Sequence, residues 1–209
     1  MTAGTTSPPP SAVDRSEFRH ILLSGTWVGL ATGAAVIVYL AVARLLPSGI
    51  FAALLETVIV LVAGVAVTFL PGGFAASRTV QGIASAAAIG LWGTVVFMAV
   101  DVILLRPFRA YPWTWDAVGG GSSWWYLPIW WMLGTFLAWL GALVTAGRVA
   151  RGGEPAIRNL ALPLLAGGVG AALGLGFSRV VYMPVAAGIG FTATLIVFAL
   201  VVIARRKQG

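Results

Sequence analysis

Six long apolar runs, separated by short polar breaks, make up most of this 209-residue chain. They cover Ile21–Leu46, Phe51–Leu70, Val80–Leu105, Tyr126–Thr145, Leu160–Phe177 and Pro184–Ala204. A helix that crosses a bilayer needs about 20 consecutive apolar residues, and each run is close to that length or longer. The pattern predicts an all-α polytopic membrane bundle of about six transmembrane helices. The main alternative is five spans, with the last two runs merged or one of them re-entrant.

Composition supports a membrane protein. Hydrophobic residues form 59% of the chain, charged residues form 9%, and the mean hydropathy is +0.97. A soluble domain carries about 25% charged residues, so this chain cannot cover a surface that faces water. The net charge of +7 sits at the ends of the apolar runs. These charges therefore indicate how the spans are oriented in a lipid bilayer, and we expect no nucleic-acid partner.

The remaining segments are short tails and one long loop. Residues 1–20 include Pro8-Pro9-Pro10 and a charged collar, and we expect them to form a disordered tail. The first apolar run is longer than the core of a signal peptide, which predicts an uncleaved span. The membrane domain then covers residues 21–204, with a tryptophan-rich loop at 106–125. Residues 205–209 form a basic C-terminal tail.

The positive charges predict which ends of the spans face the cytoplasm. With a cytoplasmic N-terminus, nine basic residues lie inside: Arg15, Arg19, Arg78, Arg148, Arg151, Arg158, Arg205, Arg206 and Lys207. Four lie outside: Arg44, Arg106, Arg109 and Arg179. This excess has the sign that the positive-inside rule requires. We therefore expect both termini to be cytoplasmic, the loop to be external, and the protein to lie in the cell (inner or plasma) membrane.

The stretch Arg106–Trp131 holds six of the nine tryptophans and a Gly-Gly-Gly-Ser-Ser tract. Tryptophan and arginine contribute most to the binding energy of protein interfaces. The candidate partner-contact residues in the loop are Trp113, Trp115, Asp116, Trp124 and Trp125. They favour contact with other membrane protein subunits or with further copies of this chain.

Two acidic residues lie inside apolar runs, Glu56 in the second and Asp101 in the third. Both fall four or five residues, and so about 6–8 Å, below the same external boundary. Burial of a carboxylate in a membrane is costly, which makes both acids candidates for binding a cation, a proton or a polar ligand. Structural ion pairing is the alternative. Arg44, Arg106 and Arg109 are the candidate partners.

Small residues recur at intervals of four in several spans. Gly25, Gly29 and Gly33 do so in the first span, and Ala166, Gly170 and Gly174 in the fifth. This spacing places small residues on one helix face, where backbones can approach closely. We expect these faces to pack within the bundle, or else against another copy or a partner subunit.

The sequence offers little for catalysis. His20 is the only histidine and there is no cysteine, so we predict neither a metal nor a cofactor, and no enzyme activity. The leading hypothesis is a small subunit of a larger membrane complex, which contacts its partners through the aromatic loop. The alternative is a permease for ions or small solutes, or the substrate-binding membrane subunit of a transporter, with an external acidic site. A membrane enzyme that acts on lipid is third.

Reporter fusions test the topology. A reporter fused after Gly209 should be active in the cytoplasm, and one inserted at Gly120 should be active outside, because the arginine excess sets the orientation. Cytoplasmic activity of the Gly120 insertion would overturn the assignment of the loop and of both acids to the external side.

Overall fold

The computed structural model describes residues 18–76, 79–108, 110, 126–150, 157–176, 178 and 181–206. Its helices are α1 (Phe18–Leu45), α2 (Ile50–Phe74), α3 (Val80–Val100), α5 (Tyr126–Val149), α6 (Ile157–Ala171) and α7 (Met183–Arg206). Two five-residue π-helical turns, η1 (Asp101–Leu105) and η2 (Ala172–Gly176), extend α3 and α6. Six of the described helical segments are long and apolar enough to cross a membrane. The prediction of a six-helix, all-α membrane bundle is confirmed.

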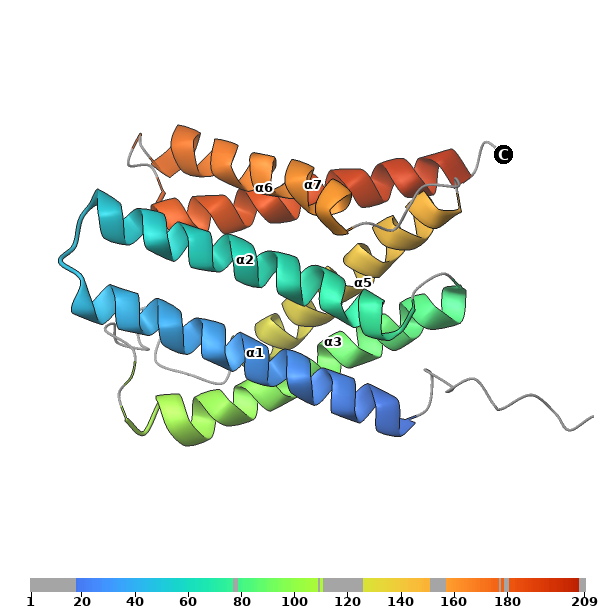
Figure 1. Ribbon diagram of the computed structural model, residues 1–209, viewed down its shortest axis with the longest axis horizontal. Coiled ribbons are helices and arrows are strands. Elements are labelled where there is room, and N and C mark those ends of the chain that lie inside the picture. The colour runs from blue at the N-terminus through green and yellow to red at the C-terminus, as the bar shows by residue number, and fades with distance from the viewer. Residues whose placement is uncertain are drawn as a thin grey trace, which may run out of the picture.

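Helix α2 is the centre of the bundle, because it packs against α1, α3, α5, α6 and α7. The α1–α3 pair lies on one side of it and the α6–α7 pair on the other (Figure 1). The start of α1 and the end of α7 lie at the same end of the molecule. The α1–α2 connection lies at the opposite end, which we call the loop end because α3 and η1 also finish there.

Several helix boundaries differ from the sequence expectation by three or four residues, and the start of α1 and the end of α2 are two of them. Helix α1 begins at Phe18, inside the expected tail, and His20 Nε2 lies 3.1 Å from the carbonyl oxygen of Phe74. This contact joins the start of α1 to the end of α2. Helix α2 continues through Pro71, where we expected it to stop. Pro71 lies in the last turn, so its missing N–H removes a single hydrogen bond, and Ala75 N still donates to Pro71 O at 3.0 Å.

The glycines of α1 lie against α3. A Cβ added to Gly29 would meet the carbonyl oxygen of Gly93 at 2.5 Å, and one added to Gly93 would meet Gly25 O at 3.1 Å. The two backbones therefore approach each other more closely than any side chain would allow. Trp92 Nε1 donates to Thr26 Oγ1 at 3.1 Å across the same crossing. A Cβ added to Gly33 would meet Val100 Cγ1 at 3.4 Å, which is a looser contact.

The fifth span packs through a different face from the one we expected. Gly170 and Gly174 are exposed, and a Cβ at either position would meet nothing within 4 Å. Gly167 and Gly168 make the close contacts, with Thr194 and Gly190 of α7 and with Leu61 of α2. Small residues occur on two faces of α6, and the four-residue spacing marks the face that is turned outward.

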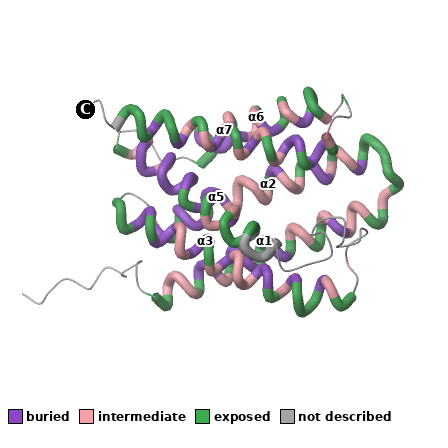
Figure 2. The backbone as a smooth tube through the Cα atoms, turned by 180° about the vertical axis from the view of Figure 1, so that it is seen from behind, coloured by how far each residue is buried: buried purple, intermediate pink, exposed green. Residues whose placement is uncertain are grey.

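The interior between the two ends is mainly apolar, although Thr68 and Ser85 are also buried there. Ile89, Leu164 and Leu195 are completely buried, and they belong to one hydrophobic cluster that includes residues from all six helices. Figure 2 shows the buried positions along the facing sides of the helices and the exposed positions on their outer sides. The outer sides are rich in large apolar residues, as expected of surfaces that face lipid.

Substitution of Gly29 by leucine should destabilise the bundle by at least about 2 kcal/mol, since the new side chain would enter a backbone contact. Gly170→Leu is the matched control and should leave stability unchanged, because that position opens outward. Thermal unfolding in detergent measures both. Equal midpoints for Gly29→Leu, Gly170→Leu and the wild type would mean that the α1–α3 crossing does not hold the bundle.

Candidate functional site

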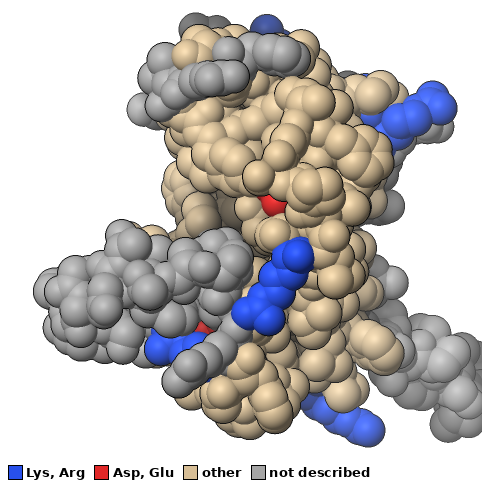
Figure 3. Space-filling view, turned by 90° about the vertical axis from the view of Figure 1, so that its left-hand side faces the viewer, with Lys and Arg blue, Asp and Glu red and all other residues tan. Residues whose placement is uncertain are grey.

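Glu56 and Asp101 are buried at the loop end, with 3% and 1% of their surface exposed. They are the only acidic residues in the described part of the chain. Figure 3 views this end, and acidic atoms are visible in two separate places, with basic atoms beside and between them. The carboxylates thus face the protein interior and occupy different parts of the loop end.

Asp101 is paired with Arg106. The Nε atom of Arg106 donates to Asp101 Oδ2 at 3.2 Å, and its backbone N–H donates to the carbonyl oxygen of Asp101 at 3.0 Å. The backbone bond spans five residues, which is the π-helical pattern. The π-turn therefore places residue 106 over residue 101 and fixes Arg106 at the point where the chain leaves η1.

Glu56 has different neighbours. The phenol of Tyr182 donates a hydrogen bond to Glu56 Oε2, and the phenol of Tyr39 interacts with both residues. These three side chains come from α2, from the residue before α7, and from α1. No lysine or arginine among the described residues forms an ion pair with Glu56. The carboxylate is therefore held by tyrosines, in contrast to the arginine partner of Asp101.

The Tyr182 phenol remains a donor at neutral pH. Partial burial of this group, its hydrogen bond to Glu56 and the nearby negative charge all raise the pKa of Tyr182 above its ordinary value. Half of the Tyr182 side chain, 54%, is nevertheless exposed at the protein surface. Tyr182 therefore joins the buried carboxylate to the outside of the bundle.

Of the other candidate residues, only Arg44 lies within the described part of the chain. Arg44 is exposed in the last turn of α1 and lines a cavity of about 260 Å³ with Leu40, Leu105 and Ala110. The remaining candidates fall outside the described residues: Arg109, Trp113, Trp115, Asp116, Trp124 and Trp125.

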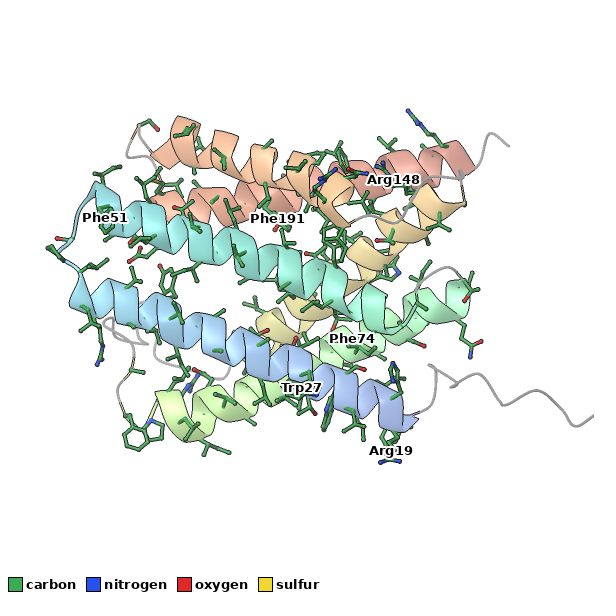
Figure 4. All side chains as sticks on the ribbon, in the orientation of Figure 1. Arg19, Trp27, Phe51, Phe74, Arg148 and Phe191 are labelled. Atoms are coloured by element: carbon green, nitrogen blue, oxygen red, sulfur yellow. The ribbon has the colours of Figure 1, made fainter. Side chains whose placement is uncertain are left out.

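An apolar groove of about 320 Å³ runs between α1 and α2. Its walls extend from Val28 to Val38 on α1 and from Val58 to Leu70 on α2. Figure 4 shows the side chains along the two helices, with Phe51 near the loop end of α2 and Phe74 near its other end. Glu56, Tyr39 and Tyr182 are not among the residues that line this groove.

Tyr39 and Tyr182 were not among the predicted partners of Glu56. All four tyrosines fall near the external ends of the predicted spans or in the predicted external loops, where amphipathic rings favour the head-group level. A tyrosine at the same depth as a buried acid is a usable signal, because its phenol can donate to the carboxylate.

Comparisons with protein-family models, with curated proteins and with solved structures give no match to this chain. In the part of the chain that the structure describes, no three His, Cys, Asp or Glu side chains gather as a metal site would require. The geometry around the two acids is therefore the basis for the proposals below.

A double-mutant cycle tests the buried pair. Asp101→Asn and Arg106→Gln should each lower the free energy of unfolding by about 2 kcal/mol, since each removes one charge from a largely buried ion pair. The double variant should cost less than the sum, with a coupling of at least about 1 kcal/mol. Thermal unfolding in detergent measures the cycle, and Arg19→Gln, at the opposite end, is the neutral control. Additive losses would show that the two side chains do not act as a pair.

Proposed function

We propose that this protein is a non-enzymatic subunit of a larger membrane assembly, which contacts its partners through the tryptophan-rich loop 106–125. The observation that carries the proposal is the Asp101–Arg106 pair. A buried carboxylate, 1% exposed, anchors the residue at which the loop begins. Because the first residue of the loop is already fixed, the loop loses less conformational entropy when it binds a partner.

The close packing of the helices supports a structural role, in which the bundle holds the loop in place. Gly29 against Gly93, and Gly168 against Leu61, are contacts of a kind that leaves little room for rearrangement. Ile89, Leu164 and Leu195 fill the interior between the two ends.

We further propose that both termini are cytoplasmic and that the loop is external in the cell membrane, from the nine-to-four distribution of basic residues.

The second candidate is a permease for cations or small solutes. The Glu56 carboxylate favours it, because this group is buried, is held by tyrosine and forms no ion pair with the described lysines and arginines. A permease also needs a polar path across the bilayer. Below Glu56, α2 buries only two threonines, Thr57 and Thr68, among apolar residues such as Leu61 and Phe69, and this thin set of polar groups favours the subunit proposal.

The test compares assemblies extracted with mild detergent from the native membrane. The double variant Trp113→Ala/Trp115→Ala should weaken the association with partners at least about tenfold, because interface tryptophans contribute most of the binding energy. Trp27→Ala is the matched control, since Trp27 is 69% exposed on the outer side of α1. Native gel electrophoresis and quantitative cross-linking measure the assembly.

The thermal midpoint of the purified protein should be the same in both tryptophan variants, which separates lost contact from lost folding. An assembly that survives the loop variant, or a wild-type protein that is extracted as a lone monomer, would refute the subunit proposal. Uptake of a cation into proteoliposomes that Glu56→Gln abolishes would instead establish the permease.

A further inference from the structure

Three side chains from three parts of the fold meet at the loop end, and we call them the Glu56 cluster: Glu56 of α2, Tyr39 of α1 and Tyr182 just before α7. The Tyr182 phenol donates to Glu56 Oε2. The Tyr39 phenol is hydrogen-bonded to Tyr182 and interacts electrostatically with Glu56. Because the α1–α3 pair and the α6–α7 pair lie on opposite sides of α2, the cluster joins the two sides of the bundle (Figure 1).

The Glu56 cluster holds a negative charge that no described residue balances. Glu56 is 3% exposed, and no lysine or arginine among the described residues forms an ion pair with it. Burial of a carboxylate is unfavourable unless an opposite charge and several hydrogen bonds compensate it. Among the described residues, Tyr182 alone donates to Glu56, whereas a carboxylate can accept about four hydrogen bonds. Asp101 has Arg106 beside it, so of the two acids Glu56 is the one that can take a further positive group.

The ligands in this cluster are all oxygen atoms, from one carboxylate and two phenols. Oxygen is the ligand that hard cations prefer, and alkali cations in membrane proteins are held largely by neutral oxygens. They therefore do not need a group of three acidic, histidine or cysteine side chains, which is lacking among the described residues.

The charge of the cluster favours a monovalent ion. Glu56 and Asp101 are the only acids in the described part of the chain, and acidic atoms appear in two separate places at the loop end (Figure 3). Glu56 thus supplies a single negative charge. A divalent ion would leave a positive charge uncompensated at a buried position, whereas a monovalent cation balances one carboxylate.

Tyr182 provides access to the cluster from outside. Its side chain is 54% exposed, although its phenol contacts the buried carboxylate. An ion that arrives beside Tyr182 can exchange water ligands for phenol and carboxylate oxygens. The backbone N–H of Ala186 donates to the carbonyl oxygen of Tyr182 at 2.9 Å, so the position of Tyr182 is coupled to the first turn of α7.

We propose that Glu56, Tyr39 and Tyr182 form a binding site for a monovalent alkali cation, which holds α1, α2 and the start of α7 together at the loop end. The ion balances the carboxylate and is coordinated by the phenol oxygens. This site requires neither a partner at the loop nor transport across the bilayer. It therefore goes beyond the subunit and permease proposals and can hold or fail independently of both.

Thermal unfolding of the purified full-length protein in detergent tests the site. Sodium chloride and potassium chloride are the probes, each titrated against N-methyl-D-glucamine chloride at constant pH and ionic strength, so that screening by salt does not change. At least one alkali ion should raise the midpoint saturably, by at least about 3 °C at ten times its dissociation constant, because it binds the folded state. A wild-type midpoint that depends on neither ion would overturn the proposal.

Two acid variants locate the ion. Glu56→Gln keeps the size of the side chain and an acceptor for Tyr182 but removes the charge, so the folded variant should lose the cation-dependent shift. Asp101→Asn is the matched control, because it removes the other buried carboxylate at the same end. This variant should unfold at a lower temperature and keep the full shift, since Asp101 is paired with Arg106. An unchanged shift in folded Glu56→Gln would overturn the proposal.

Two phenylalanine variants keep the proposal testable if Glu56→Gln fails to fold. Tyr39→Phe and Tyr182→Phe each remove one oxygen and keep the ring and the carboxylate, so each should raise the dissociation constant of the ion at least about tenfold. Hydrogen exchange is a second measurement, in which the ion should slow exchange of the Ala186 N–H in the wild type. Dissociation constants that match the wild type in both phenylalanine variants would place the ion elsewhere and refute the site.

Discussion

Contact between helix backbones at glycine is the interaction on which the rest of this bundle depends. A transmembrane bundle gains no hydrophobic energy when one apolar helix leaves lipid for another, so its stability comes from close packing. Here a Cβ at residue 29 would lie 2.5 Å from the carbonyl oxygen of Gly93. A Cβ at residue 93 would in turn lie 3.1 Å from the carbonyl oxygen of Gly25. The same type of approach joins α3 to α5 at Gly90 and Gly134, and α6 to α7 at Gly167 and Gly190. With these contacts in place, α2 can pack against all five other helices.

The buried acids show two ways to keep a carboxylate inside a membrane protein. Asp101 has a permanent counter-charge on its own chain segment, and the result is a fixed local structure. Glu56 accepts a hydrogen bond from the neutral phenol of Tyr182, the residue before α7, and forms no ion pair with a described lysine or arginine. The Glu56 carboxylate has capacity for a further hydrogen-bond donor or a cation, and that capacity gives Glu56 the chemistry of a binding residue.

The sequence predicted the number and type of the helices because each apolar run is long enough to cross a bilayer. It also predicted that Glu56 and Asp101 lie at the same depth below one boundary, and both are buried at that end of the bundle. It could not predict which small-residue face of α6 packs, since Gly167 and Gly170 are equally small and only the neighbouring helices distinguish them. Nor could it bring Tyr182 to Glu56, because 126 residues separate them and the pairing depends on how α7 is placed against α2.

The π-turn at η1 determines how many residues can separate Asp101 from Arg106 while the two side chains still meet. In a regular α-helix, side chains three or four residues apart face each other, and those five apart do not. Asp101 and Arg106 are five apart and meet because η1 is wound more widely. Loss of one residue from 102–105 would rewind this turn to an α-turn and place the arginine four residues after the aspartate, where the two would meet again. In a related sequence, a one-residue gap between these two positions would therefore be compatible with the same ion pair.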